Sequence, residues 1–504
     1  MRKLLGVDIG TTHCKVGLFA LDGSEMKIAT AETVTHYDSD GQAYFKPEEI
    51  WGNVTGLIKE TTGGHDQEPV VVGITSMAET GVLVERATGF SKSEMIPWFD
   101  TRTIEQAEWI GKEIDAFSAF QKTGLHNSYK YGLAKLLWLE KRDPGITKGA
   151  VWLSAADYIA YRLTGEIGTD YSLAARTFAF RIDKKEWDVP WLSHFGLEEE
   201  LFPHAGPSGE AVGRISTGEF EKIGLAKGTP VAVSGHDHVC AASAVGAVHP
   251  GIVFDSIGTA ETLVGTLEKW HLGEKEFRSG LSFGCHVAAD RYFWMGSLPS
   301  SGGSVEWFRR QFSEKVLSYE EIDRLLREAA EGPTGILYYP YLSGSGSTHR
   351  HSKARSSFIG MNKTHRKGDL IKAVLEGTAF EMESIRQVAG ETVDFQMNEL
   401  IAVGGGTRNQ TWMQIKADVS NCTLSIPPFS EATLLGAAVV AGIGCGIYGS
   451  EEEAMALLKK GKSTVVRPDQ DDHKAYRKMY EKGYKALGEP LFSYFGNLAE
   501  ERNE

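Results

Sequence analysis

Cysteine is scarce in this sequence and forms no pattern that would build a disulfide framework or a zinc site. The cysteines are odd in number and scattered, and none has a neighbour at CxxC spacing: they are Cys14, Cys240, Cys285, Cys422 and Cys445. Disulfide-rich domains and structural zinc sites use closely spaced sets of cysteines. We therefore expect reduced thiols and an intracellular protein.

Long apolar runs and an excess of basic residues are also missing. Asp8 interrupts the first apolar stretch, so it is too short for a signal sequence. Nowhere do about 18 apolar residues follow one another, as a membrane span requires. The formal net charge is -14, which disfavours binding to nucleic acid or to an anionic membrane. The sequence thus predicts a cytoplasmic protein with neither partner.

What the chain does have is enough length for more than one core. A single hydrophobic core usually stops growing at about 250 to 300 residues, and this chain has 504. Strand-like and helix-like segments alternate along it, which predicts the α/β class. We place one lobe at residues 1–247 and a second at residues 248–504, without a low-complexity linker between them.

Two short patterns occur once in each half of the chain. An apolar hairpin with an Asp shortly before a Gly-Thr pair occupies residues 4–23 and again 251–268. A strand, a glycine-containing loop and a helix are predicted at residues 230–248 and 399–419. Such repetition favours two related lobes that face one another across a cleft, although chance similarity of short hairpins would look the same.

The first hairpin turn has the chemistry of a phosphate and metal site. Gly10, Thr11 and Thr12 offer backbone N–H groups and hydroxyls that can surround a phosphate. Asp8, at the end of the preceding strand, can hold Mg²⁺ through its carboxylate, and Lys15 can add positive charge. A threonine-rich turn without a ligand is the alternative interpretation.

The second half of the chain offers two further turns. Gly258 and Thr259 would approach the same nucleotide from the opposite lobe if both hairpins bind phosphate. Residues 404–406, three glycines between a predicted strand and a helix, would allow close approach of a flat or anionic ligand. A tight strand-to-helix turn is the alternative, and Asn409 stands where a dinucleotide fingerprint would need glycine.

A candidate general base follows another apolar strand. Asp237 lies where the strand ends and a helix begins, a position from which a carboxylate can accept a proton from a substrate hydroxyl. Phosphoryl transfer needs little more from a protein than a base, a metal and positioning. Asp237 as a helix cap, and His236 and His238 as metal ligands or as packed residues, are the alternatives.

Polar side chains beside aromatic rings suggest a wall for a sugar. Glu79 follows an apolar strand, and Trp98 and Asp100 follow a shorter apolar run. Carboxylates accept hydrogen bonds from hydroxyls while rings cover the C–H faces of a sugar. A tryptophan in such a place belongs to a core more often than to a ligand site.

Taken in order, these motifs resemble the FGGY carbohydrate kinases. The order is DIGTT, GIT…ET, W-x-D-x-R, GHD, IGT and GGGTRN, and the resemblance runs nearly from end to end. It implies an α/β, two-lobed actin-like ATPase or ribonuclease H-like fold, that of the sugar kinase/Hsp70/actin superfamily. It also implies a carbohydrate kinase that brings ATP, Mg²⁺ and a small sugar or polyol together in the cleft. A homodimer is the family-level expectation for assembly.

The resemblance also assigns roles to residues. By similarity, Asp8, Gly10, Thr11 and Thr12 handle phosphate and Mg²⁺, Gly258 and Thr259 contact phosphates from the second lobe, Gly405 and Asn409 hold the nucleotide, and Asp237 is the catalytic base. The departures concern the substrate. Glycerol kinase has an Arg where this chain has Ala78 and a tyrosine where it has Lys130, and xylulokinases have Met-His where it has Met77 followed by Ala78.

These departures argue against glycerol and D-xylulose as substrates. A longer ketose, such as a pentulose or a deoxyhexulose, or a polyol fits Glu79, Trp98, Asp100 and His238 better. A kinase for another polyhydroxy substrate, namely a sugar acid, glycerol or autoinducer-2, is the first alternative. A non-metabolic ATPase or a sugar sensor of the same fold is the second. The GHD motif, Glu79 and Trp98 argue against the ATPase, and the presence of Asp8, Thr11 and Asp237 argues against the sensor.

Overall fold

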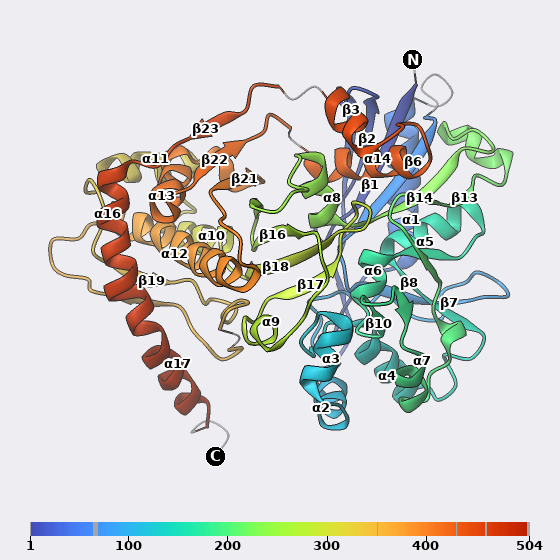
Figure 1. Cartoon of the computed structure of the whole chain (residues 1–504), viewed down its shortest axis with the longest axis horizontal. Helices are drawn as coiled ribbons and strands as arrows, with labels where there is room; N and C mark the ends of the chain where they lie inside the picture. Colours follow the sequence, from blue (N-terminus) through green and yellow to red (C-terminus); the bar gives the residue numbers. More distant parts are fainter. Residues whose placement is uncertain (1, 64–68, 350, 430, 459–460, 501–504) are drawn as a thin grey trace.

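The computed structural model describes residues 2–63, 69–349, 351–429, 431–458 and 461–500, and two sheets organise it (Figure 1). The first sheet has the order β13-β14-β6-β1-β2-β3. Its strands are β1 Lys3–Ile9, β2 His13–Ala20, β3 Glu25–Glu32, β6 Val71–Ser76, β13 Ala211–Arg214 and β14 Pro230–His236. The second has the order β17-β18-β16-β15-β21-β22-β23. Its strands are β15 Ile252–Ile257, β16 Glu261–Leu267, β17 Ser282–Cys285, β18 Tyr292–Leu298, β21 Glu399–Val403, β22 Thr423–Ile426 and β23 Thr464–Val466.

The two sheets repeat one topology, which confirms the prediction of an α/β protein with two related lobes. In the first, β1 is antiparallel to β2 and parallel to β6. In the second, β15 is antiparallel to β16 and parallel to β21. Both predicted hairpins and both predicted strand–loop–helix units are present, the latter as β14 with α8 Asp237–Ala244 and as β21 with α13 Gln410–Ser420.

Helices cover both sheets (Figure 1), and the remaining short strands pair in separate two-stranded sheets. The helices are α1 Pro47–Thr62, α2 Ile104–Glu113, α3 Ala116–Thr123, α4 Gly132–Arg142, α5 Ala155–Thr164, α6 Tyr171–Ala175, α7 Val189–His194, α8 Asp237–Ala244, α9 Glu274–Arg278, α10 Gly302–Gln311, α11 Tyr319–Glu328, α12 Lys367–Val393, α13 Gln410–Ser420, α14 Ala432–Gly444, α15 Glu451–Leu457, α16 Gln470–Met479 and α17 Lys485–Glu500. The short strands are β4 His36–Tyr37, β5 Ala43–Tyr44, β7 Gly81–Glu85, β8 Ala150–Ser154, β9 Gly168–Asp170, β10 Phe180–Arg181, β11 Glu186–Trp187, β12 His204–Gly206, β19 Leu337–Tyr339 and β20 Ser357–Ile359. Among the described residues, no helix combines the length and the apolar character needed to cross a membrane.

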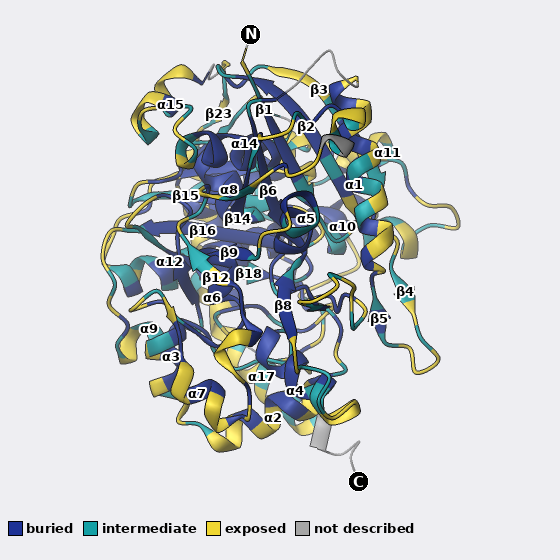
Figure 2. Cartoon of the chain, turned by 90° about the vertical axis from the view of Figure 1, so that its right-hand side faces the viewer, coloured by how far each residue is buried: buried dark blue, intermediate teal, exposed yellow. Residues whose placement is uncertain are grey.

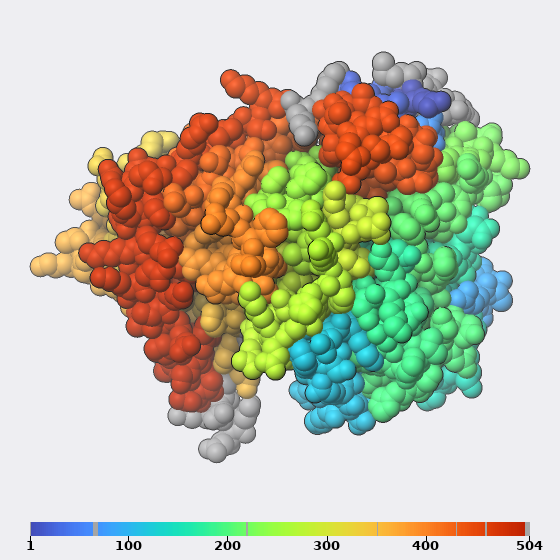
Figure 3. Space-filling model, in the orientation of Figure 1, coloured from blue at the N-terminus to red at the C-terminus, as the bar shows by residue number. Residues whose placement is uncertain are grey.

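Helix α14 returns from the second half of the chain to the first sheet. Glycines of β1 and β6 allow this contact, because a Cβ on Gly6 would lie 2.2 Å from the Leu434 carbonyl oxygen and one on Gly73 would lie 2.1 Å from that of Ala437. Figure 3 shows this segment, in orange-red, on the half of the molecule that carries the N-terminal residues. The first lobe therefore includes a helix from the range 248–504.

Helix α8 makes the reciprocal exchange. It follows β14 of the first sheet, but Val239 and Cys240 pack in one core with Phe254 and Phe293 of the second sheet. The two exchanged helices touch closely, since a Cβ on Gly436 would lie 2.0 Å from the carbonyl oxygen of Cys240. Figure 2 shows both helices and the sheets beside them as buried. The connection between the lobes is therefore a packed core.

Candidate functional site

Three parallel strands of the first sheet end side by side and bring the predicted polar residues to one edge. Ile9 of β1 lies opposite Ser76 of β6, and Ser76 lies opposite His236 of β14. Ligands of open α/β sheets bind outside the carboxyl ends of the strands. The first phosphate turn, the segment with Glu79 and the segment with Asp237 thus share one edge.

The turn that carries Asp237 is held from two neighbouring elements. A register shift in β14 between Val233 and Gly235 marks a bulge there. The Ser234 hydroxyl donates to the Ala437 carbonyl of α14 at 2.7 Å, and the Thr75 hydroxyl donates to the Gly235 carbonyl at 2.5 Å. Bulges often re-aim side chains beside active sites. The structure therefore confirms the predicted strand end and helix start at Asp237.

The Asp237 carboxylate remains partly open to solvent, at 22% exposure. Its Oδ1 accepts the backbone N–H of His238 at 2.7 Å and lies 3.3 Å from Nε2 of His236. Burial lowers the pKa of His236 to about 4, so this imidazole is neutral near pH 7. His238 is half-buried one residue further along α8. The described residues contain no group of three or more His, Cys, Asp or Glu side chains arranged to hold a metal ion.

Asp8 is poised for a cation. Its Oδ1 is buried and has no hydrogen-bond partner among the described residues. Burial, and then the negative charge of Asp237, raise the pKa of Asp8 to about 8, while Lys15 opposes the rise. A divalent cation beside the carboxylate would oppose both effects, because it favours the ionised form. Mg²⁺ is commonly held by one or two carboxylates together with phosphates and water, so the residues present fit that ion.

The turn after Asp8 is braced from the next strand. Gly10 N–H donates to the His13 carbonyl at 3.0 Å, and the Thr33 hydroxyl donates to the Gly10 carbonyl at 2.9 Å. Thr12 is exposed at the tip of this turn. Thr11 touches Met77 through its hydroxyl at 3.5 Å. This geometry leaves the turn free to face a ligand.

The predicted phosphate-binding Lys15 already has a carboxylate partner. Its Nζ lies 2.7 Å from Oε2 of Glu431, which stands just before α14. Both side chains are about one quarter exposed, at 28% and 25%. Lys15 therefore joins the phosphate turn to the helix that returns from the second half of the chain. Sequence reasoning missed Glu431.

The Gly258 turn of the second lobe rests on the start of α10. Gly302 N–H donates to the Gly258 carbonyl at 3.0 Å, and Gly303 N–H donates to that of Thr259 at 2.9 Å. A Cβ on Gly302 would lie 2.4 Å from the Gly258 oxygen, so only glycine allows this approach. Gly258 and Thr259 themselves are exposed.

The three glycines at residues 404–406 follow β21, the strand next to β15. Ser256 of β15 pairs with Val403 of β21, so these glycines lie beside the Gly258 turn. Gly405 is exposed, and a Cβ there would meet no atom within 4 Å. Asn409 caps α13, since its Oδ1 accepts the Trp412 N–H at 2.9 Å. The arrangement leaves room for a flat group against the backbone.

Asp255, which corresponds to Asp8 in the repeat, lies in the core of the second lobe. It is fully buried beside Lys416, whose Nζ lies 3.4 Å from Asp255 Oδ2 and 2.5 Å from Glu261 Oε1. Burial, and then the charge of Glu261, raise the pKa of Asp255 to about 8, with Lys416 opposing. The Ser301 hydroxyl donates to the other oxygen of Glu261 at 2.5 Å. The second hairpin therefore uses its carboxylate to hold a core.

Glu79 faces two cations that sequence reasoning did not assign to the site. Arg176 Nε donates to its Oε1 at 2.9 Å, and Lys130 Nζ lies 3.5 Å from the same oxygen. Although burial favours the neutral carboxyl, Arg176 and then Lys130 hold the pKa of Glu79 well below its usual range. Glu79 also has a backbone φ of 59°, which is rare for a residue with a side chain. Glu79 is therefore an ionised acceptor in a constrained position.

The other two residues of the predicted sugar wall differ in their surroundings. Trp98 is 38% exposed, and its indole Nε1 donates to the Thr11 hydroxyl at 3.0 Å. Asp100 is buried, and its two oxygens accept from Arg102 Nε and from Ala43 N–H, both at 2.6 Å. The structure brings Trp98 to the phosphate turn, whereas it uses Asp100 to hold its own loop.

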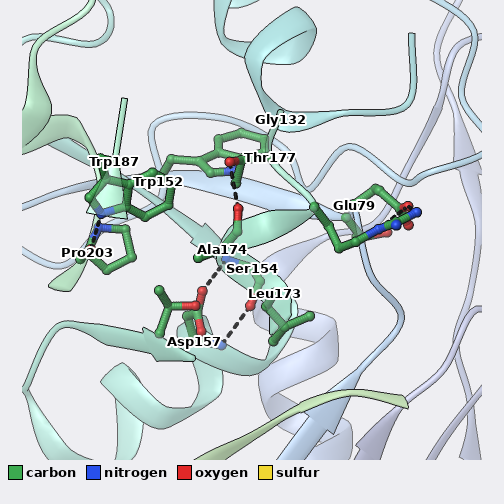
Figure 4. Close-up of a pocket in the computed structure, with 13 residues that line it drawn as sticks. Glu79, Gly132, Trp152, Ser154, Asp157, Leu173, Ala174, Thr177, Trp187 and Pro203 are labelled. Atoms are coloured by element: carbon green, nitrogen blue, oxygen red, sulfur yellow. Dashed lines mark hydrogen bonds and ion pairs between the residues drawn. The ribbon is translucent and has the colours of Figure 1, made fainter. Parts of the chain in front are cut away.

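A small cavity lies behind Glu79 (Figure 4). Its volume is about 20 Å³ and its lining includes Asp157, Thr177 and Trp152. Oδ1 of Asp157 is buried without a hydrogen-bond partner in the described part of the chain, and burial raises the pKa of this carboxyl to about 7. A cavity of this size holds about one water molecule. It is too small for a sugar.

Comparisons with known proteins show the family of the chain. The N-terminal domain of the FGGY family of carbohydrate kinases matches residues 3–245, and the C-terminal domain matches residues 256–445. Xylulose kinase of Bacillus subtilis (strain 168) is 29% identical over 465 residues, 90% of each chain. Glycerol kinase of Gloeobacter violaceus is 29% identical over 464 residues, again 90% of each chain. Gluconate kinase from Lactobacillus acidophilus has a similar crystal structure, with a TM-score of 0.90, 20% identity and 99% of both chains covered.

Proposed function

Because the chain belongs to the FGGY family of carbohydrate kinases, we propose that it phosphorylates a small ketose or related polyol with Asp237 as the general base. Members of this family transfer a phosphoryl group to an alcohol, so the chain is a carbohydrate kinase of the two-lobed actin-like class that uses ATP. The finer proposal rests on one observation. Asp8 and Asp237 meet at the edge of three parallel strands, with charges close enough to raise the pKa of Asp8.

The base acts on the hydroxyl of the sugar. Asp237 is partly exposed at the start of α8, and one of its oxygens, Oδ1, is occupied by the His238 N–H. The other oxygen would accept the proton as the hydroxyl attacks the γ-phosphorus of ATP. Because burial keeps His236 neutral, no imidazolium charge lies beside the Asp237 carboxylate.

The nucleotide would lie between the lobes. Gly258 and Thr259 would contact its phosphates, and the open backbone at Gly405 with the nearby Asn409 would hold the remainder. Asp8 would hold Mg²⁺, with Thr11 and Thr12 beside the phosphates. When bound, Mg²⁺ neutralises charge on the phosphates. Lys15, which is paired with Glu431, would add positive charge at the edge of this region.

The sugar would lie against Glu79 and Trp98, with His238 beyond them. Glu79 is ionised and can accept hydrogen bonds from substrate hydroxyls, while Arg176 and Lys130 balance its charge. The Lys130 side chain is 32% exposed, so it borders the space that a substrate would fill. A pentulose or a deoxyhexulose suits such a wall. Relatives named for xylulose, glycerol and gluconate make a polyol or a sugar acid the alternative.

A panel assay tests this proposal. ADP release is measured with Mg-ATP against pentuloses, hexuloses, polyols, sugar acids and 4,5-dihydroxy-2,3-pentanedione. We expect strong turnover with one ketose or polyol, and Asp237→Asn should lower that turnover by about 10² to 10⁴ while nucleotide affinity stays nearly unchanged. Undiminished sugar-dependent turnover in the variant would remove Asp237 from its role. No turnover with any compound, with ATP still bound, would favour the sensor interpretation.

A further inference from the structure

We propose that Asp170 and Ser172 are positioning residues that hold the general base Asp237 and the sugar acceptor Glu79 at a fixed position relative to each other. The inference rests on the roles proposed above for those two carboxylates. Both positioning residues are buried and lie in a short segment, at the end of β9 and the start of α6. Their effect on catalysis passes through the backbone of the Asp237 turn and through Arg176.

Ser172 braces the turn directly. Its hydroxyl oxygen accepts the backbone N–H of His236 at 2.9 Å, one residue before Asp237. Ser172 is fully buried and His236 is 4% exposed, so water cannot replace this acceptor. A buried N–H that loses its partner is strongly unfavourable, so the backbone would move to find another.

The contact with the turn is tight. Gly235 has a φ of 113°, which favours glycine, and a Cβ there would lie 2.5 Å from Ser172 Oγ and 2.9 Å from Asp170 Oδ2. The turn therefore sits directly on these two polar side chains. Movement of either side chain is transmitted to the backbone that aims Asp237.

Asp170 fixes Ser172 in turn. Its Oδ2 accepts the Ser172 N–H at 2.9 Å and the Ser208 hydroxyl at 2.6 Å, and its Oδ1 accepts the Leu173 N–H at 3.0 Å. These bonds cap α6, and Asp170 is only 1% exposed. The carboxylate thus sets both the start of the helix and the direction of Ser172.

The far end of the same helix serves the substrate wall. Arg176 is the residue at which α6 ends, and it pairs with Glu79. One short helix therefore braces the base from its first turn and the sugar acceptor from its last. Because misplacement by about 1 Å can lower a rate by about 10²-fold, this helix sets the distance on which in-line transfer depends.

The test compares Ser172→Ala with Ser279→Ala. Ser279 is a matched control, since it is also buried and its hydroxyl accepts a backbone N–H, that of Leu281 at 3.1 Å, but it lies beside α9. For Ser172→Ala we expect kcat on the best panel substrate to fall by about 10 to 100-fold, with the KM for ATP within twofold of wild type. Ser279→Ala should leave kcat within twofold. Equal kcat values for the two variants would overturn the proposal.

A second measurement does not depend on turnover. Hydrogen–deuterium exchange of the peptide that covers residues 234–239 should accelerate in Ser172→Ala and stay at the wild-type rate in Ser279→Ala. Unchanged exchange in Ser172→Ala would also overturn the proposal. If the wild type phosphorylates no panel compound, the proposed function fails, while the exchange rates still decide whether Ser172 holds the turn.

Asp170→Asn and Asp170→Ala separate geometry from folding. Asparagine keeps one acceptor oxygen, which can still cap α6 by accepting the N–H of Ser172 or of Leu173, so Asp170→Asn should lose less kcat than Asp170→Ala. Asp170→Ala removes both acceptors and should lower kcat at least as far as Ser172→Ala. If Asp170→Ala keeps the wild-type kcat at a temperature where it is folded, Asp170 has no positioning role.

Discussion

The indole nitrogen of Trp98 donates a 3.0 Å hydrogen bond to the hydroxyl of Thr11. This bond joins the proposed sugar wall to the phosphate turn, two segments separated by more than 80 residues in the chain. Thr11 also contacts Met77, which follows β6. A ligand that displaces Trp98 would therefore also release the Thr11 hydroxyl, so we expect sugar binding and phosphate binding to be linked at this contact.

Trp98→Phe tests that link. Phenylalanine keeps an aromatic ring but loses the N–H donor, and one hydrogen bond contributes about 0.5 to 1.5 kcal/mol. We expect kcat/KM for the sugar to fall by about 2 to 13-fold, because Thr11 loses its orientation. Steady-state kinetics with Trp109→Phe, an exposed indole that packs on Phe195, provide the control. A Trp98→Phe enzyme with the kinetics of the control would show that the bond has no part in catalysis.

Glu79→Gln should weaken use of the sugar more than use of the nucleotide. The change removes the charge opposite Arg176, which is 3% exposed, and weakens the acceptor for substrate hydroxyls. Hydrogen bonds to charged groups contribute about 1.5 to 3 kcal/mol, so we expect kcat/KM for the sugar to fall by about 10 to 150-fold. The KM for ATP should change by less than threefold.

Lys130→Met is the comparison for Glu79→Gln. It removes the partner of Glu79 that is more exposed and further away, at 3.5 Å. We expect a smaller loss in sugar kcat/KM, by less than about tenfold, because Arg176 still balances the carboxylate. A larger loss in Lys130→Met than in Glu79→Gln would mean that Lys130, and not Glu79, makes the main contact with the substrate.

Much of the site was predictable because its residues follow strand ends. Alternating apolar runs and Gly-Thr turns predict the hairpins, and parallel strands then bring Asp8 and Asp237 to one edge. The partners Arg176 and Glu431 were not predictable. Arg176 lies 97 residues from Glu79 in the chain, and Glu431 lies 416 residues from Lys15, so no local sequence pattern indicates either pair. The burial of Asp100 depends on its loop closing on Ala43, which likewise has no local signal.

The organisation of the lobes was predictable only in outline. The hairpin repeat indicates two lobes, but the return of α14 to the first sheet depends on close contacts between backbones at Gly6 and Gly73. A glycine within a strand suggests close approach without naming the neighbour. The family match from 3–245 and 256–445 covers both lobes, and the assembly of the protein stays a prediction.

The raised pKa of Asp8 predicts a loss of stability as pH rises. In the unfolded chain Asp8 ionises near its ordinary value of 3.8, whereas in the folded protein without a metal its pKa is about 8. Between these values the folded state holds a proton that the unfolded state has lost, so the free energy of unfolding decreases with increasing pH. The decrease is at most about 1.4 kcal/mol per pH unit and ends near pH 8.

Urea unfolding at pH 5.5 to 8.5 checks this against Asp8→Asn. The asparagine variant lacks the titration, so its stability relative to wild type should rise across the window. Asp40→Asn, at an exposed carboxylate, should follow the wild-type curve. Added Mg-ADP should flatten the wild-type slope, because a bound cation favours the ionised carboxylate. Parallel curves for Asp8→Asn and wild type would show that Asp8 is ionised in the folded protein.

Lys416→Met should destabilise the second lobe. Lys416, Asp255 and Glu261 are all fully buried, and the lysine is the cation of this cluster. Removing one partner of a buried ion pair leaves an uncompensated charge and typically lowers the free energy of unfolding by about 3 to 5 kcal/mol. The Gly258 turn should loosen as well, because Ser301, which binds Glu261, donates its backbone N–H to the Thr259 carbonyl. We therefore expect weaker nucleotide binding together with the loss of stability.

Lys474→Met is the matched control, since its pair with Asp471 is exposed and three residues apart on α16. Such exposed pairs contribute little to stability, because water screens the two charges. Urea unfolding and nucleotide titration of both variants separate the two effects. A Lys416→Met protein as stable as Lys474→Met would mean that the two buried carboxyl groups need no cation beside them. Such a result would remove the electrostatic argument for the second turn.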